Sequence, residues 1–257
     1  MFRLTLLLLA LSVAAAAPLP DAPPFYPSPA FIPAGPQQAR GALVWLHGGY
    51  DSDTEPLPPV ETWVERLARR GYDIWRFDRT PGQDPLIQGG EALVRGLAAL
   101  RQGGYRRVIV AGQSRGAFIA LAVLAHPELV DALAAISPAA HGTRPERRAQ
   151  AMSDFRDRLD AAAGPMRFAL VQLDDDPFDP DADGRAALAR AAAARAGFSL
   201  LLIDRPPTPR GHMGSYEPEF DAIFGACLAR FLDRADGSER SGCDAQPDFC
   251  CAIKKGG

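Results

Sequence analysis

The feature that most constrains this chain is a five-residue motif at positions 112–116, Gly-Gln-Ser-Arg-Gly. An apolar, β-branched run precedes it at 107–111, and an alanine-rich amphipathic run follows it. This pattern predicts a strand that reverses sharply into a helix, with Ser114 at the tip of the turn. Such a turn crowds the positions two residues before and after the serine, which therefore favour glycine. The hydroxyl of a serine at this tip is exposed, and the main-chain N–H groups of the helix N-terminus lie where an oxyanion would form. Ser114 is therefore a candidate nucleophile. The alternative is an ordinary strand–turn–helix unit with no catalytic role.

Composition limits the classes of protein that this chain can belong to. A chain of 257 residues that is 47% hydrophobic can bury one large core, and a single α/β domain often has this size. The net charge is −3 and the 28 basic residues are dispersed. We therefore expect no nucleic-acid partner and no affinity for an anionic membrane surface.

The N-terminus has the pattern of an export signal. Residues 1–3 give a short basic start, 4–13 are almost wholly apolar, and 14–16 are alanines. We predict a signal peptide over 1–16, cleaved after Ala16, since cleavage after Ala17 would place Pro18 just past the cut. The apolar run is short for a bilayer, which needs about 20 residues. The expected location is periplasmic or secreted, without a stable membrane span; an uncleaved anchor is the alternative.

Residues 17–40 are rich in proline, with eight prolines between Pro18 and Pro36. This composition favours an extended N-terminal arm without a core of its own. Four apolar residues could pin the arm to the domain: Phe25, Tyr26, Phe31 and Ile32. We nevertheless interpret the arm as a tether.

From Gly41 onwards, strand-like and helix-like runs alternate. The strand-like runs are 42–46, 73–77, 107–111, 129–136, 167–173 and 198–203. The helix-like runs are 59–70, 86–101, 115–125, 145–162, 184–196 and 216–234. This alternation predicts an α/β domain over 41–235, a three-layer αβα sandwich with a mostly parallel sheet of about six strands. Residues 141–164 can supply one or two cap helices, so we expect a minimal lid or none.

Polar residues follow several of the predicted strands. His47, Gly48 and Gly49 come after the first strand, Ser114 after the third, an acidic run at 174–179 after the fifth, and His212 after the sixth. Open parallel sheets bind ligands beyond the carboxyl ends of their strands. The chain order serine, acid, histidine is that of the α/β-hydrolase fold.

On these residues the chain resembles an α/β-hydrolase-superfamily serine hydrolase, of the dienelactone-hydrolase-like and carboxylesterase-like kind. The resemblance covers about 41–234 and rests on 43–49, 112–116, and the late acid and histidine. It implies an acyl-enzyme intermediate, a small-molecule acyl substrate and, most simply, a carboxylic ester hydrolase. Because the fold hosts many chemistries, amide, thioester and lactone bonds stay open, as does a catalytically silent binding protein.

The resemblance and the chemistry assign a role to each candidate. Ser114 is the expected nucleophile and His212 the base that later protonates the leaving group. Of the other histidines, His47 is expected to brace its loop and His126 to cap a helix, while His141 is a possible substrate contact.

The expected acid is Asp176, which lies three positions past Leu173 and just before a Pro-Phe pair, the spacing that the family resemblance implies. Asp179 is the main alternative. Weaker candidates are Asp174, Asp175 and Asp204.

The oxyanion hole is expected to combine the main-chain N–H of Arg115 with that of Gly49, ahead of Gly48. Tyr50 borders this loop and could line the acyl pocket. A role for the Arg115 side chain in binding an acidic substrate is open.

No cofactor or metal is expected. Residues 179–184 reproduce the opening of a calcium loop, with aspartates at 179, 181 and 183 and a glycine at 184. The bidentate Glu of loop position twelve is replaced by Arg190. A solvated turn is therefore the favoured interpretation.

All four cysteines fall late in the chain, at 227, 243, 250 and 251. In an exported chain an even count predicts two disulfides, with three possible connectivities. A bond between Cys250 and Cys251 would be strained, so Cys227 and Cys243 are expected to pair with one each, attaching the tail at 236–257 to the last helix. Free thiols in the tail are the alternative. The sequence indicates no oligomeric state.

Overall fold

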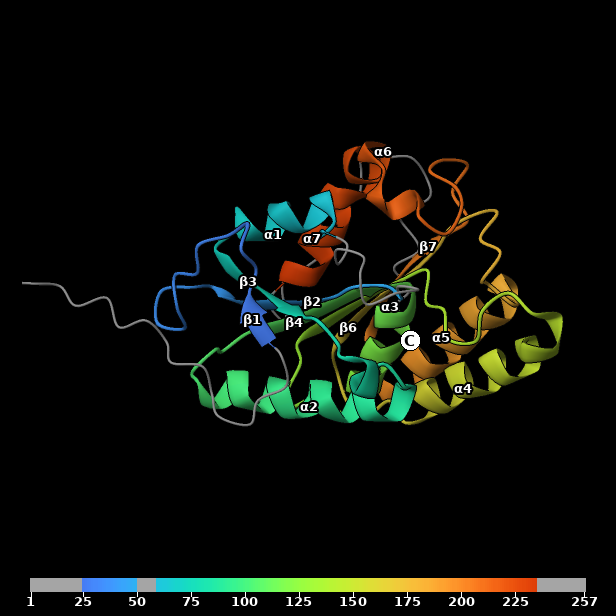
Figure 1. The fold of residues 1–257 in the computed structure, drawn as a ribbon, viewed down its shortest axis with the longest axis horizontal. Helices are drawn as coiled ribbons and strands as arrows, with labels where there is room; N and C mark the ends of the chain where they lie inside the picture. The colour runs from blue at the N-terminus through green and yellow to red at the C-terminus, as the bar shows by residue number, and fades with distance from the viewer. Residues whose placement is uncertain (1–24, 50–58, 235–257) are drawn as a thin grey trace, which may run out of the picture.

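The computed structural model describes residues 25–49 and 59–234, which form a seven-stranded sheet between two layers of helices (Figure 1). The strand order is β1-β3-β2-β4-β5-β6-β7, and all neighbours are parallel except β1 and β3. The strands are β1 (Phe25–Pro27), β2 (Gly41–Leu46), β3 (Tyr72–Phe77), β4 (Val108–Gln113), β5 (Ala132–Ile136), β6 (Arg167–Gln172) and β7 (Ser199–Asp204). The predicted three-layer αβα sandwich is confirmed.

Helices cover both faces of the sheet (Figure 1). One face carries α1 (Glu65–Ala68), α6 (Pro218–Phe220) and α7 (Ala226–Asp233). The other carries α2 (Leu86–Gln102), α3 (Ser114–Ala120), α4 (Arg148–Asp160) and α5 (Ala182–Ala196). Short 3₁₀ turns are η1 (Thr62–Val64), η2 (Pro81–Gln83), η3 (Leu121–Ala125), η4 (Pro145–Arg147) and η5 (Gly214–Tyr216), and η6 (Asp221–Gly225) is a π-helical turn.

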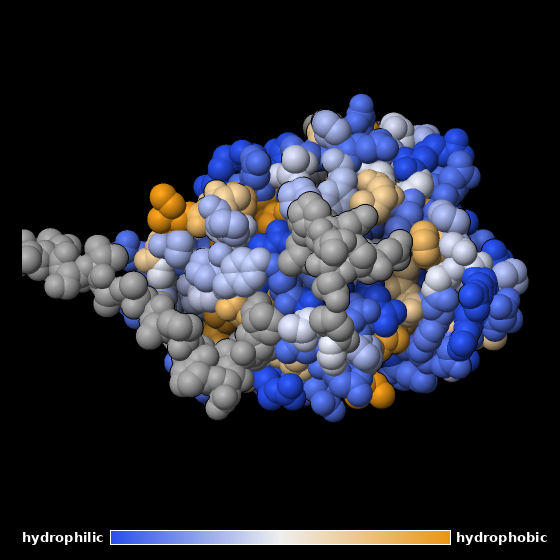
Figure 2. All heavy atoms as spheres, viewed as in Figure 1, coloured by the Kyte–Doolittle hydropathy of each residue, from blue (hydrophilic) through white to orange (hydrophobic). Residues whose placement is uncertain are grey.

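The core is divided by the sheet because successive side chains of a strand point to opposite faces. Along β2, Val44 and Leu46 pack into the cluster under α2–α5, whereas Leu43 and Trp45 pack into the cluster under α1 and α7. Hydrophilic residues predominate on the visible outer surface over α2 and α4 (Figure 2). The strands are therefore covered on both sides, which explains their continuous apolar runs.

The start of the described chain differs from the predicted tether. Phe25–Pro27 forms an antiparallel edge strand on β3, and the ring of Phe25 lies 5.1 Å from that of Phe77. Tyr26 donates a hydrogen bond to Asp78, whereas Ile32 is 98% exposed and pins nothing. The folded unit thus begins at least sixteen residues before Gly41, so the boundary expected there is wrong. A three-residue strand within a proline-rich stretch leaves no periodic signal in the sequence.

Several helices are shorter or more irregular than predicted. The run at 115–125 divides into α3 and the 3₁₀ turn η3, and the run at 59–70 is helical only over Thr62–Ala68. The last run begins at Pro218, whose ring suits a first helical position, and contains the π-helical turn η6. In the region of the expected cap, α4 packs against α5 and buries Phe155 and Leu159 in the core, so it belongs to the helix layer.

The turn from β4 into α3 has the sharp geometry that the motif predicts. Ser114 adopts a φ of +54°, a left-handed conformation that is strained for a residue with a Cβ. A Cβ on Gly116 would lie 2.5 Å from the carbonyl oxygen of Leu46, and one on Gly112 would lie 2.8 Å from the carbonyl carbon of Gly116. The two glycines therefore let the helix begin directly against the end of β2.

Three of the predicted features lie outside the described residues: the signal peptide at 1–16, Tyr50, and the tail at 236–257. Cys227 is buried on α7, but the other cysteines are in that tail, and the pairing stays a prediction. Within 25–49 and 59–234, no helix has both the length and the apolar content to cross a membrane.

We predict that Gly116→Ala lowers the free energy of unfolding by about 3 kcal/mol, because the added methyl group overlaps the rigid backbone of β2. Urea denaturation measures this loss. Gly82→Ala is the matched control: its Cβ would lie 4.0 Å from its nearest neighbour, Thr80 Oγ1, and its stability should stay within about 1 kcal/mol of wild type. Equal stabilities for the two variants would contradict the packing described here.

Candidate active site

The structure brings Ser114, His212 and Asp176 together at the carboxyl edge of the sheet. The His212 Nε2 atom lies 2.7 Å from Ser114 Oγ, and its Nδ1 atom lies 2.9 and 3.0 Å from the two carboxylate oxygens of Asp176. The carboxylate accepts from Nδ1–H, which leaves Nε2 as an acceptor for the serine hydroxyl. The side chain of Asp176 is 3% exposed and that of His212 12%, so little water competes for these bonds.

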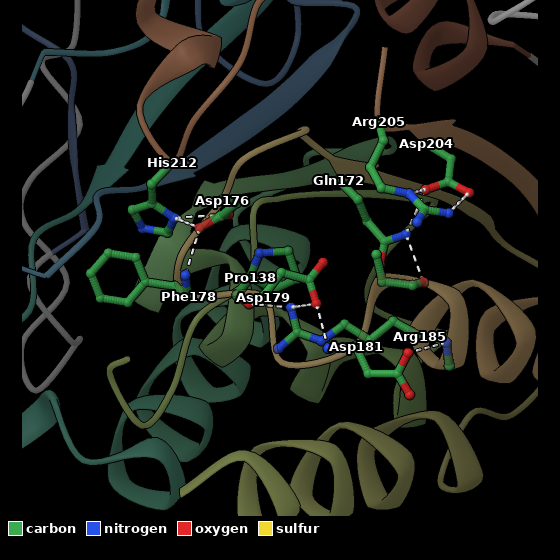
Figure 3. Close-up of polar contacts among 12 residues, drawn as sticks. Pro138, Gln172, Asp176, Phe178, Asp179, Asp181, Arg185, Asp204, Arg205 and His212 are labelled. Carbon is green, nitrogen blue, oxygen red and sulfur yellow. Dashed lines mark hydrogen bonds and ion pairs between the residues drawn. The ribbon is translucent and has the colours of Figure 1, made fainter. Parts of the chain in front are cut away.

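The loop after β6 turns the candidates for the catalytic acid toward different partners (Figure 3). Asp176 also accepts from the backbone N–H of Phe178, whose ring packs 4.2 Å from the imidazole of His212. Asp179 instead faces the buried Arg185, at 3.5 Å. The remaining candidates pair with exposed arginines: Asp174 and Asp175 with Arg210, and Asp204 with Arg205.

The loop that carries His212 is held by the elbow and by the acidic loop. Gln113, which is buried beside the serine, donates from Nε2 to the main-chain oxygen of His212 at 3.0 Å. The N–H of Gly211 donates to the Asp174 carbonyl at 2.7 Å. Gln113 lies inside the motif, but its role was not predicted because the motif leaves that position unspecified.

The two glycines after β2 lie beside the elbow. A Cβ on Gly48 would come within 3.3 Å of Ser114 Cβ, and one on Gly49 would lie 3.9 Å from Arg115 Cβ. The proposed donors of an oxyanion hole are thus neighbours of the nucleophile. The Arg115 guanidinium pairs with Asp84 at 2.8 Å and donates to the Ala140 carbonyl, so its charge is already balanced.

The other histidines have structural partners. His47 is fully buried, and its Nδ1 donates to the Gly48 carbonyl at 2.6 Å while its Nε2 accepts from the Arg79 N–H. Burial, with the nearby charge of Arg79, lowers the pKa of His47 to about 3, so the ring is neutral and braces its loop. His141 Nε2 lies 2.6 Å from Asp154 of α4, and His126 contacts Glu128.

The carboxylates of the calcium-like motif are turned toward different partners. Asp181 accepts from the Gly184 N–H and caps α5, and Asp183 pairs with Arg205. Among the described residues, no group of three or more histidine, cysteine or acidic side chains is arranged to hold a metal ion.

A buried acid lies near the loop of His212. Glu61 is 1% exposed and accepts from Ser215 Oγ at 2.6 Å and from Trp63 Nε1 at 2.5 Å. Burial raises the pKa of Glu61 to about 7, against the effect of these two hydrogen bonds. Nothing in the local sequence distinguishes Glu61 from an exposed glutamate, so its burial was not predicted.

The sequence of the chain matches a known protein family. A model of the alpha/beta hydrolase family matches residues 43–240, and the chain belongs to this family. No curated protein matches the chain significantly by sequence. The superfamily that the motifs predicted is confirmed.

Solved structures share the fold at low identity. An esterase from Pyrococcus furiosus is 15% identical, with a TM-score of 0.56 over 76% of this chain and 82% of that one. Est1E from Butyrivibrio proteoclasticus is 14% identical, with a TM-score of 0.52 over 78% and 90%. An acylaminoacyl peptidase from Pyrococcus horikoshii is 12% identical, with a TM-score of 0.55 over 79% and 39%.

We predict that Glu61 makes the protein less stable as the pH rises from about 4.5 to 7. In this range the folded state keeps a proton that the unfolded state has lost, so stability decreases with pH. The loss should approach about 3 kcal/mol relative to Glu61→Gln, whose amide oxygen can accept from Trp63 while its NH₂ group donates to the Ser215 hydroxyl. Urea denaturation across this pH range measures it.

Glu65→Gln provides the matched control, because Glu65 is exposed on α1. Its stability should follow the wild-type pH dependence. If Glu61→Gln also followed the wild-type curve, Glu61 would not be the group that holds the extra proton.

Proposed function

We propose that the protein is a serine hydrolase in which Ser114 is the nucleophile, His212 the general base and acid, and Asp176 the residue that orients the imidazole. One observation carries this proposal: a continuous hydrogen-bonded chain from Asp176 through His212 to the Oγ of Ser114, on a strained turn. Membership of the alpha/beta hydrolase family supports it.

The reaction follows from the roles of these groups. His212 Nε2 takes the hydroxyl proton as Ser114 Oγ attacks the acyl carbon, and Asp176 stabilises the imidazolium that forms. The tetrahedral intermediate collapses to an acyl-serine as His212 protonates the leaving group. His212 then activates a water molecule that releases the carboxylic acid and restores Ser114. The N–H groups of Arg115 and of Gly49, or of Gly48 in its place, would receive the negative oxygen.

The simplest substrate for this arrangement is a small carboxylic ester, whose alkoxide leaving group needs less help from an acid than an amine does. One structure of similar fold is an esterase, but another is an acylaminoacyl peptidase. Amide, thioester and lactone bonds are therefore alternative targets of the same residues. Residues 1–16 support export to the periplasm or the medium as part of this proposal.

We predict that a fluorophosphonate probe labels the wild-type protein and that Ser114→Ala abolishes labelling. His212→Ala should slow labelling by at least about 1,000-fold, because the serine hydroxyl then lacks its base. In-gel fluorescence measures the label, with His126→Ala as a control that reacts like wild type. An unlabelled wild-type protein would indicate a catalytically silent binding protein. A panel of p-nitrophenyl esters, lactones and anilides then identifies the preferred bond.

We predict that Asp176→Asn lowers kcat on the preferred substrate by about 10⁴-fold, since the amide cannot hold the imidazole in the required tautomer. Asp179→Asn should stay within about 3-fold of wild type, because that carboxylate faces Arg185. Steady-state kinetics on folded variants separates the two. A larger loss at Asp179 than at Asp176 would assign the acid to Asp179.

A further inference from the structure

A buried arginine holds the loop that follows β2. Arg79 comes two residues after β3 ends, and its side chain is 0% exposed. Its Nη1 donates to the carbonyl of His47 and its Nη2 to that of Gly48, both at 2.9 Å. The Gly48 carbonyl also accepts from His47 Nδ1. Two successive peptide groups are thereby fixed by one guanidinium.

The orientation of these carbonyls determines where the corresponding N–H groups point. In a trans peptide the C=O and the following N–H point in opposite directions. With the carbonyls of His47 and Gly48 turned to Arg79, the N–H groups of Gly48 and Gly49 are directed away from the guanidinium. Gly48 lies against Ser114, where an added Cβ would be 3.3 Å from the serine Cβ.

Asp84 connects Arg79 to the elbow. Its Oδ1 lies 3.2 Å from Arg79 Nε, and its Oδ2 lies 2.8 Å from Nε of Arg115, the residue directly after the nucleophile. Asp84 ends the short turn η2, which is closed by a reciprocal capping box between Thr80 and Gln83. The carboxylate thus joins the loop after β2 to the first residue after Ser114.

We propose that Arg79 is a positioning residue for the oxyanion hole. It fixes the direction of the Gly48 and Gly49 N–H groups, and Asp84, which contacts both Arg79 and Arg115, holds them in place relative to the N–H of Arg115. This inference rests on the proposed function, since it needs an acyl group on Ser114. The planar guanidinium presents Nη1, Nη2 and Nε in a fixed fork, and here each of them faces a different acceptor. A lysine would satisfy part of this set.

The test compares variants of Arg79 with a matched arginine at the opposite edge of the sheet. Arg101 also donates to two carbonyls, those of Leu129 and Arg106, and to a carboxylate, that of Asp131. The variants are Arg79→Met, Arg79→Lys, Asp84→Asn and Arg101→Met. For each, kcat and KM on p-nitrophenyl acetate, the pH profile, and inhibition by an alkyl trifluoromethyl ketone are measured. The ketone forms a tetrahedral adduct with the serine and places an oxyanion in the hole.

Arg79→Met should lower kcat by about 10- to 100-fold, with KM within about 3-fold and the pH profile unmoved. Its inhibition constant for the ketone should rise by about the same factor as kcat falls. Arg79→Lys should recover part of the kcat and part of the affinity for the ketone. Asp84→Asn should lower kcat and weaken inhibition by the ketone to a smaller extent than Arg79→Met does. Arg101→Met should stay within about 2-fold of wild type in both quantities. If Arg79→Met does not fold, Arg79→Lys and Asp84→Asn decide the question, since Asp84 is partly exposed.

Two results would overturn the inference while leaving the proposed function intact. One is an active wild type whose Arg79 and Asp84 variants lose no more activity than Arg101→Met. The other is a fall in kcat without weaker inhibition by the ketone. A wild type that neither reacts with the fluorophosphonate nor hydrolyses any ester, lactone or anilide would instead overturn the proposed function, and this inference with it.

Discussion

The site depends on the close packing of α3 against the end of β2. Gly116 lies so near the Leu46 carbonyl that no side chain fits between them, and this proximity forces the chain to reverse at Ser114 with a positive φ. The serine hydroxyl is thereby presented beyond the sheet, next to the loop at His47–Gly49. Strain at one residue is stable here because the surrounding core fixes both elements.

The loops at this edge are joined to one another as well as to their strands. The Ser114 carbonyl accepts from the Ala139 N–H after β5, Gln113 holds the His212 carbonyl, and the Gly211 N–H donates to the loop after β6. The hydrogen bonds of His212 are therefore set before a substrate arrives. Such preorganisation lets fixed dipoles stabilise charge that develops in the transition state.

The sequence predicted the parts of the molecule that repeat or that are sterically restricted. Six strands followed from apolar runs, and the elbow followed from the two glycines that flank Ser114. The spacing favoured Asp176 as the acid but left Asp179 open, because both follow the same strand within a few residues. The structure brings Asp176 to His212 and directs Asp179 to Arg185.

Other features left no pattern to read. The edge strand at Phe25–Pro27 is too short to show a period, and the prolines around it suggested a tether. Arg79 acts through backbone carbonyls of a loop about thirty residues earlier, and one arginine among many carries no local signal. What does point to Arg79 and Asp84 is their place in the chain just after β3, at the sheet edge where ligands bind.

The proposed function requires that a covalent acyl-serine forms at Ser114. Rapid quenching after mixing with p-nitrophenyl acetate, followed by tryptic digestion and mass spectrometry, tests this directly. We predict one acetyl group per molecule, on the peptide spanning residues 108–115, appearing together with a burst of p-nitrophenol. Turnover of the ester with no acetyl group on that peptide, or with the acetyl group on another residue, would contradict the claim.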